Sequence, residues 1–360
     1  MTKKENLFTT IIFLLVIFCG GISIWVVKDR EFSNNENRVL KERPKLSATA
    51  LVSGKYMGDF DEYVSDQFPL RDGCMEIATG YKRLLGMKDV TGVYIGKDGY
   101  LLTKTDEAAV DSKRVEKNIR YFNEFFGKHQ EKNITFMLVP EASMVLSDKL
   151  PTKADISWEW DLLNNIRDNI EGAKIAHPED NMLKSDLQMY YRTDHHWTGY
   201  GAYEAYKEFS GKTSELEFQV VTEEFLGSLH SKVLSSDIEA EDIVVGTANV
   251  PILADGKELM LYDYDALDKK DKYQVFQGGN HGMVKIKGNG EGNILVIKDS
   301  FANSFVPFLV EDYENIIMVD LRYYMGNMNT LCLSEGITDI LVLYQIGNFI
   351  SDENIIKLGL

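Results

Sequence analysis

Three short apolar runs in the last third of the chain constrain its fold more than any other feature. They are Asn293 to Ile297, Asn315 to Val319 and Asp339 to Ile346. Continuous apolar runs of this length are typical of strands buried on both faces, and the segments between them are long enough for crossover helices. A further run from Ile134 to Val139 predicts another buried strand. The chain therefore predicts an α/β fold, with a parallel sheet flanked by helices.

One long uncharged run lies near the N-terminus. Leu7 to Val27 carries no charged side chain, and at about 1.5 Å per residue a helix of this length spans about 30 Å, the thickness of a bilayer's hydrocarbon core. We expect an uncleaved transmembrane anchor. A cleaved signal peptide is the alternative, because Gly21-Ile22-Ser23 has the small-x-small pattern of a cleavage site, but the run exceeds the usual length of a signal peptide core.

The charges around this run bear on its orientation. Two lysines precede it and six basic residues follow it, a balance that by itself would keep the large domain in the cytoplasm. A short tail before an apolar run is nevertheless typical of a signal anchor, and long domains translocate largely regardless of charge. We expect a cytoplasmic tail at 1–6, an anchor at 7–27, a polar linker at 28–50 and a domain outside the cytoplasm at 51–360.

The composition excludes some classes of function. A formal net charge of -17 argues against nucleic acid as a partner, because phosphates require basic surfaces. No carboxylate spacing matches a calcium loop, and no strand-to-helix glycine motif indicates a nucleotide, so no cofactor is expected. Cys19 falls in the apolar run, and Cys74 and Cys332 are expected to be buried thiols rather than a disulfide.

A compact polar group, Asp194-His195-His196, precedes Trp197 and a predicted helix. In an extended segment residues i and i+2 point to the same side, so we expect Asp194 to reach the imidazole of His196 while His195 faces the opposite way. Thr198 is expected to cap the helix. A metal site is the main alternative, which we disfavour because neighbours on opposite sides do not easily share an ion.

A candidate nucleophile lies about a hundred residues further on. The strand predicted at 293–297 leads into Lys298-Asp299-Ser300, so Ser300 stands at the carboxyl end of a buried strand. Open α/β sheets carry their reactive groups at that edge, beside helix N-termini. We expect a short helix to follow, capped by Asn303 or Ser304. Ser300 would then supply the nucleophile that an Asp-His pair requires.

Two further residues follow the strand predicted at 315–319, at the same edge of the sheet. Arg322 could position a negatively charged donor or acceptor, and Tyr324 could hydrogen-bond a sugar. An ion pair between Arg322 and Asp320 is the alternative interpretation.

The region from 218 to 284 is acidic and shows no regular pattern, which indicates an irregular insertion. Tyr262, Tyr264 and Tyr273 alternate with carboxylates there. This suits carbohydrate, because aromatic rings stack on sugar faces and carboxylates accept hydrogen bonds from hydroxyls. A solvated acidic face with tyrosines in the core is the alternative. Asn280 is the candidate substrate-binding residue of this region.

At these motifs the sequence resembles a known family. The T-D-H-H-W stretch at 193–197 and the K-D-S-F stretch at 298–301 resemble the DHHW proteins of Gram-positive bacteria, and the D-x-H-W pattern is similar to that of the alginate O-acetylation proteins AlgJ and AlgX. The resemblance implies a circularly permuted, flavodoxin-like SGNH hydrolase domain. It also implies a catalytic triad in which Ser300 is the nucleophile, His196 the base and Asp194 its partner.

A third stretch extends the resemblance. Gly347 and Asn348 match the G-x-N-D block of SGNH folds, which implies that Asn348 stabilises an oxyanion, although Phe349 stands where the block has Asp. Lys298 likewise replaces the glycine of the usual G-D-S.

The resemblance implies a membrane-anchored O-acetyltransferase or acetylesterase that acts on cell-surface polysaccharide or exopolysaccharide. Its domain would lie outside the cytoplasm, where the insertion at 218–284 would cover the active site, and a membrane-bound O-acyltransferase would supply the acetyl group. A non-catalytic cell-surface carbohydrate-binding protein with a degenerate SGNH fold is the alternative.

Overall fold

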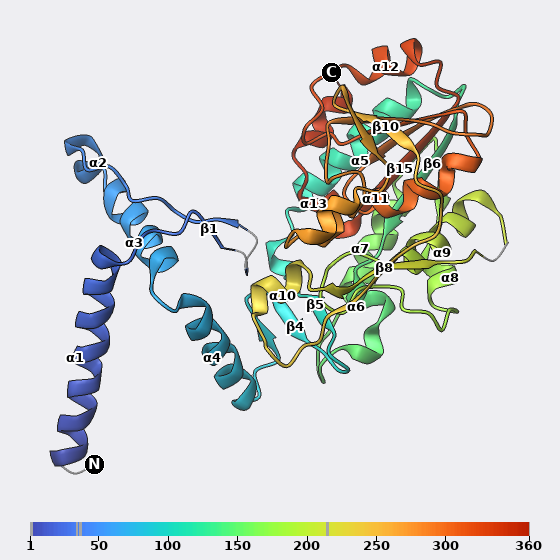
Figure 1. Ribbon diagram of the computed structural model, residues 1–360. Coiled ribbons are helices and arrows are strands. Elements are labelled where there is room, and N and C mark those ends of the chain that lie inside the picture. Colours follow the sequence, from blue (N-terminus) through green and yellow to red (C-terminus); the bar gives the residue numbers. More distant parts are fainter. Residues whose placement is uncertain (1–2, 34, 36–37, 214–215, 360) are drawn as a thin grey trace. The chain divides into compact units, whose positions relative to one another are not determined.

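The computed structural model describes residues 3–33, 35, 38–213 and 216–359. The chain divides into two compact units (Figure 1). The smaller comprises residues 1–87 and 231–237, and the larger comprises residues 88–230 and 238–360. The large unit therefore begins near residue 88 rather than at 51, because the helices between 48 and 84 group with the N-terminal segment.

The smaller unit is mainly helical. Its elements are α1 (Lys3–Val26), β1 (Phe32–Ser33), β2 (Arg38–Val39), α2 (Ala48–Val52), α3 (Lys55–Gln67) and α4 (Arg71–Leu84). Within α1, Leu7–Val26 is long and apolar enough to cross a membrane, judged by length and composition, a test that an N-terminal signal sequence also passes.

The segment predicted as a linker at 28–50 packs against α3. Arg38 forms a two-pronged ion pair with the buried carboxylate of Asp66. Arg43 donates to the hydroxyl of Tyr63 at 2.8 Å. The described part of this segment is thus held to a helix rather than extending freely.

An eight-stranded sheet organises the larger unit, in the order β11-β10-β12-β14-β13-β15-β6-β7. Its strands are β6 (Asn133–Val139), β7 (Lys174–Ala176), β10 (Pro251–Ala254), β11 (Lys257–Met260), β12 (Met283–Lys287), β13 (Asn293–Lys298), β14 (Asn315–Val319) and β15 (Asp339–Gln345). The strands from β14 to β7 are parallel, whereas β12, β10 and β11 form an antiparallel edge. The predicted α/β fold with a mostly parallel sheet is confirmed.

The prediction of an irregular insertion at 218–284 is wrong where β10, β11 and β12 lie, because these three strands belong to the main sheet. β12 pairs with β14 from Met283 opposite Val319 to Lys287 opposite Asn315. In β10 and β12 buried residues alternate with more exposed ones. Short alternating strands of this kind lack the continuous apolar run that identified the parallel strands.

The parallel strands bury side chains on both faces and so separate two cores. Along β13, Ile294 and Val296 belong to one core, whereas Leu295 and Ile297 belong to the other. Helices α9 (Gly199–Ser210) and α11 (Ala302–Phe305) contribute to the first core. Helices α5 (Ser112–Gly127), α7 (Ser157–Asp168), α12 (Met328–Ser334) and α13 (Ile346–Ser351) contribute to the second.

Shorter elements complete the structure. They are β3 (Asp89–Val90), β4 (Val93–Ile95), β5 (Leu101–Thr103), α6 (Ala142–Val145), α8 (Glu179–Met182), β8 (Gln219–Phe225), α10 (Ser228–Val233) and β9 (Glu241–Val245). Cys74 and Cys332 are free thiols, and only Cys332 is buried as predicted, because Cys74 is exposed on α4.

Candidate active site

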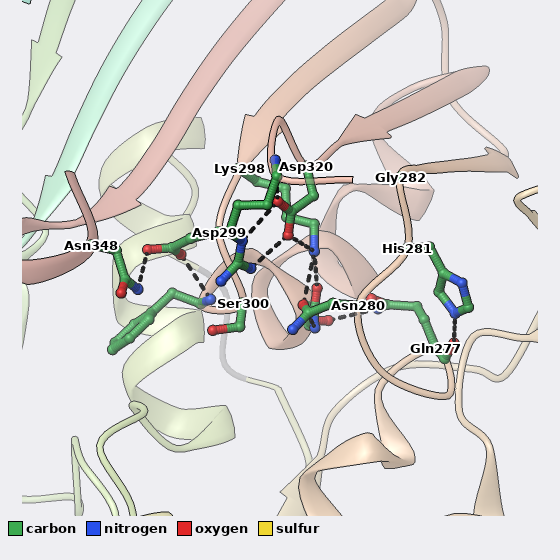
Figure 2. Close-up of polar contacts among 12 residues, drawn as sticks. Gln277, Asn280, His281, Gly282, Lys298, Asp299, Ser300, Asp320 and Asn348 are labelled. Carbon is green, nitrogen blue, oxygen red and sulfur yellow. Dashed lines mark hydrogen bonds and ion pairs between the residues drawn. The ribbon is translucent and has the colours of Figure 1, made fainter. Parts of the chain in front are cut away.

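Ser300 lies two residues after the end of β13, a strand in the middle of the sheet between β14 and β15. The buried carboxylate of Asp299 fixes the turn at this point. It accepts hydrogen bonds from the backbone N–H groups of Phe301 (2.9 Å) and Gln345 (2.8 Å) and from the side-chain amide of Asn348 (2.8 Å; Figure 2). Burial raises the pKa of Asp299, although these three bonds act in the opposite direction.

The helix after Ser300 begins earlier than predicted. Because α11 starts at Ala302, Asn303 and Ser304 lie inside it and neither caps it. Ser304 instead accepts a hydrogen bond from the indole N–H of Trp197 at 2.8 Å, and the same N–H is 3.0 Å from the carbonyl oxygen of Phe301. The tryptophan of the D-H-H-W motif thereby ties the Asp-His loop to the helix that follows Ser300.

The loop that carries the Asp-His pair folds back on itself. Tyr190 and Trp197 form an isolated antiparallel bridge. Thr198 caps α9 as predicted, since its hydroxyl accepts from the N–H of Gly201 at 3.2 Å. The loop is therefore anchored where it meets the helix.

Residues from two later segments hold the loop from outside. The buried carboxylate of Glu241 accepts from the N–H (2.7 Å) and the hydroxyl (2.6 Å) of Thr193. The N–H of Ser228 donates to Asp194 at 2.7 Å. A Cβ added to Gly227 would lie 2.3 Å from the Cβ of Asp194, so glycine is needed for this close approach. Sequence reasoning missed Glu241 and Gly227, because nothing in their local pattern indicates a contact with a loop so far away in the chain.

Asp194, His196 and Ser300 form a continuous hydrogen-bonded chain. Nδ1 of His196 lies 2.6 Å from Oδ1 of Asp194, and Nε2 of His196 lies 2.8 Å from Oγ of Ser300. The three residues are 3%, 6% and 9% exposed, so little water competes for these bonds. The arrangement is that of a nucleophile, a base and a residue that orients the base.

The electrostatics favour an ionised Asp194. Burial alone would raise the pKa of this carboxyl, but the charges of His195 and His196 and the hydrogen bonds from His196 and Ser228 outweigh it and hold the pKa well below its ordinary value. A carboxylate at this position stabilises the imidazolium that forms when His196 takes a proton.

The predicted orientation of His195 is wrong. Its ring centroid lies 3.9 Å from that of His196, and its Nδ1 lies 2.8 Å from Oγ of Ser228. The reason is that residues 192–196 form bends rather than an extended strand. One ligand atom from each of Asp194, His195 and His196 lies within 4.8 Å of the others, so these three could hold a metal ion. An ion would have to displace a hydrogen bond of His196, because both of its ring nitrogens are engaged.

A buried lysine lies beside the nucleophile. Nζ of Lys298 is 2.8 Å from Oδ1 of Asn303, 3.3 Å from Oδ1 of Asn280 and 3.7 Å from the carboxylate of Asp320 (Figure 2). Burial lowers the pKa of Lys298 to about 8, although the neighbouring Asp320 acts to raise it. The candidate residue Asn280 thus belongs to the polar surroundings of Lys298.

The other predicted substrate-binding residues are placed differently. Arg322 makes bonds of 2.9 and 2.6 Å to Asp320, the ion pair considered as the alternative. A cavity of about 320 Å³ is lined by Asp299, Arg322 and Asn348, among others. Tyr324 packs instead against the second core. Binding roles for Arg322, Asn348 and Tyr324 stay predictions.

The three tyrosines of the acidic region have different environments. Tyr262 and Tyr264 line a groove of about 1140 Å³ over β10, β11 and β12. Tyr264 is 44% exposed, whereas Tyr262 and Tyr273 are buried. Of the three tyrosines, only Tyr264 therefore presents a substantial surface on which a sugar could stack. Tyr273 packs against His196 instead.

A serine at the carboxyl end of a central parallel strand, facing a histidine that bonds to an aspartate, defines this unit as an SGNH hydrolase-like α/β domain. Two family models match the chain. Residues 93–224, which include Asp194 and His196, match the SGNH hydrolase-like domain of the acetyltransferase AlgX. Residues 253–319, which include Ser300, match the model of the DHHW proteins. The resemblance to these families is confirmed, and it relates the chain to SGNH-like acetyltransferase domains at the level of the family.

Solved structures share the fold. A DHHW family protein from Eubacterium siraeum is 21% identical with a TM-score of 0.62, and the match covers 75% of this chain and 96% of that one. PatB1 from Bacillus cereus is 19% identical with a TM-score of 0.61, covering 72% of this chain and 97% of that one. PatB1 with a sulfonyl adduct is 21% identical with a TM-score of 0.62, covering 74% and 99%. No curated protein matches the sequence.

Proposed function

We propose that the protein is a membrane-anchored O-acetyltransferase that uses Ser300, His196 and Asp194 to move an acetyl group onto hydroxyls of a cell-surface polysaccharide. The observation that carries the proposal is the pair of short contacts made by His196, 2.6 Å to Asp194 and 2.8 Å to Ser300. The relation to the AlgX acetyltransferase domain supports the choice of acyl group.

The reaction proceeds in two halves. His196 takes the proton of Ser300 while Oγ attacks the acetyl carbonyl, and His196 then returns the proton to the leaving group as the acyl-serine forms. In the second half His196 takes a proton from the acceptor hydroxyl, whose oxygen attacks the acyl carbon, and returns this proton to Oγ of Ser300 as the bond between Oγ and the acyl group breaks. Water in place of that hydroxyl makes the same site an acetylesterase.

The backbone N–H of Ser300 is the proposed donor to the oxyanion, and Asn348 assists from the start of α13. One such donor is typically worth about 3 kcal/mol in the transition state. The hydrogen bond from Asn348 to Asp299 uses one of its two amide hydrogens, which leaves the second for this role.

The N-terminal helix supports the proposed location of the protein at the membrane. Leu7–Val26 would anchor the chain, with residues 1–6 in the cytoplasm and the α/β unit outside, next to surface polysaccharide. A membrane-bound O-acyltransferase is the proposed source of the acetyl group.

The direct test compares acetate release from a chromogenic acetyl ester by the purified full-length protein and by Ser300→Ala. Ser143→Ala is the matched control, because Ser143 is also buried after a parallel strand but bonds to Glu159. We expect release by the wild type and the control and none by Ser300→Ala. Equal release by all three would contradict the serine mechanism.

A second experiment separates transfer from hydrolysis. Cells that carry Ser300→Ala should have less acetyl on their surface polysaccharide if the protein is a transferase, and more if it is an esterase. A non-catalytic carbohydrate-binding protein would bind oligosaccharide while neither the wild type nor Ser300→Ala turned over the ester.

A further inference from the structure

The imidazole of His196 lies against the ring of Tyr273. The two ring centroids are 3.9 Å apart and the ring planes differ by only 9°. No other ring contact of His196 is so nearly parallel among the described residues, since His195 and Phe301 are tilted by 39° and 47°. The sequence leaves two interpretations open for Tyr273, a surface residue that stacks on a sugar or a tyrosine in the core, and its burial, with 6% exposed, agrees with the second.

The hydroxyl of Tyr273 reaches the other half of the site. It lies 3.2 Å from Oγ of Ser304 and 3.5 Å from the carbonyl oxygen of Ser300. One side chain therefore contacts the base through its ring and the turn of the nucleophile through its hydroxyl. Tyr273 thus connects the loop of His196 with the segment that carries Ser300.

Tyr273 packs within a hydrophobic cluster that is separate from the two main cores. The residue belongs to the 3-10 helix η4 (Lys272–Val275). Its ring meets Tyr191 edge-on at 6.3 Å and Phe276 at 5.1 Å. The buried members of this cluster are Tyr191, Phe225, Ile243, Val245, Tyr262, Tyr273, Val275 and Phe276.

We propose that Tyr273 is a positioning residue of the catalytic site, whose ring orients His196 and stabilises the positive charge that the imidazole gains when it takes the proton of Ser300. The face of an aromatic ring attracts a cation placed against it. This inference rests on the proposed function, because it assigns His196 the role of base. Burial raises the pKa of Tyr273 well above its ordinary value, so its ring stays neutral while His196 cycles.

The sign of the pH effect follows from the geometry. A ring that stabilises the imidazolium makes protonation easier, so it moves the acid limb of the reaction to higher pH. Removing the ring moves that limb to lower pH. Asp194 and His195 also face the imidazole, and Asp271 and Asp299 lie near Tyr273. All four remain in every variant below, so they do not contribute to the difference.

The experiment follows the reaction of Ser300 with phenylmethylsulfonyl fluoride in the full-length protein from pH 5 to 9, by mass spectrometry. In this reaction Oγ of Ser300 bonds to sulfur, the S–F bond breaks, fluoride leaves and His196 takes the proton. Tyr273→Leu removes the ring and leaves a smaller apolar side chain. We expect its rate to fall by about threefold to thirtyfold and the midpoint of its acid limb to drop by about half a pH unit or more. Tyr273→Phe should keep the midpoint of the wild type.

Tyr262→Leu is the matched control, because Tyr262 is buried in the same cluster and bonds to Thr247. It should leave the midpoint unchanged even if it destabilises the fold. An unchanged midpoint in Tyr273→Leu, or an equal drop in Tyr262→Leu, would overturn the inference. If wild-type Ser300 takes up no sulfonyl group, the proposed function fails. NMR of the wild-type protein then decides the stacking claim: nuclear Overhauser contacts between the rings of His196 and Tyr273 support it, and their absence refutes it.

Discussion

Replacing Gly227 with alanine should disable the site by displacing Asp194. The added Cβ would lie 2.3 Å from the Cβ, 2.5 Å from Oδ2 and 2.8 Å from the Cα of Asp194. Carbon atoms in contact prefer about 3.5–4.0 Å, so the two segments must separate by about 1 Å. The N–H of Gly227 bonds to the hydroxyl of Thr193 at 3.0 Å, so its displacement disturbs the same loop.

The magnitude follows from this displacement. A misplacement of about 1 Å in a catalytic group can cost on the order of 100-fold in rate, and overpacking of this kind costs about 1–3 kcal/mol of stability. We expect Ser300 to react with phenylmethylsulfonyl fluoride about 100-fold more slowly in Gly227→Ala. The free energy of unfolding in urea should fall by about 1–3 kcal/mol.

Gly127→Ala provides the matched control. Gly127 ends α5, and a Cβ there would meet no atom within 4 Å. Alanine in a helix is favoured over glycine by about 0.5–1 kcal/mol, so this variant should react at the wild-type rate and be no less stable. If Gly227→Ala and Gly127→Ala react equally fast, the reasoning that links the position of Asp194 to reactivity is refuted.

Three further predictions concern buried ionisable groups. Asp194→Asn should slow acetyl ester hydrolysis by about 10³–10⁴-fold, because an amide that donates to Nδ1 of His196 leaves a proton on Nε2, where Ser300 needs an acceptor; a loss under tenfold would contradict this role. Burial lowers the pKa of Lys298 from its ordinary value of 10.5 to about 8 in the folded state, so the unfolded state binds more protons between these two pH values. The free energy of unfolding of the wild type, relative to that of Lys298→Met, should therefore rise by about 1.4 kcal/mol per pH unit in this range. A difference, measured by urea unfolding, that stays constant from pH 8 to 9.5 would contradict this prediction. Glu159, whose burial and proximity to Glu141 raise its pKa from 4.5 to about 7, has the opposite sign. Wild-type stability relative to Glu159→Gln should fall as pH rises from 4.5 to 7, and a difference that does not change with pH would refute it.

The parallel strands and the pairing of Asp194 with His196 could be predicted from the sequence because both depend on local pattern. Burial on both faces makes each central strand a continuous apolar run, and β13, β14 and β15 lie close to where these runs predict them. Two residues apart in one loop, Asp194 and His196 are close whatever the rest of the chain does. The nearness of Ser300 to His196 was predicted from the resemblance and from the edge of the sheet at which Ser300 stands.

Features that depend on distant segments could not be predicted in this way. The orientation of His195 is set by bends that Glu241 and Ser228 hold in place through contacts with the loop. The stacking of Tyr273 on His196 joins segments far apart in the chain, and nothing around Tyr273 distinguishes it from Tyr262 or Tyr264. The misplaced caps at Asn303 and Ser304 have a local cause instead: α11 begins at Ala302, and the carboxylate of Asp299 accepts from the N–H of Phe301 just before it.

The most direct measurement of the central claim is the site of acetylation during turnover. The full-length protein would be mixed with a chromogenic acetyl ester, quenched in acid within the first turnovers, digested and analysed by mass spectrometry. We predict one acetyl group on the peptide that contains Ser300, absent from Ser300→Ala and strongly reduced in His196→Gln. Ester turnover with no acetyl on Ser300, or with acetyl on another side chain, would contradict the account.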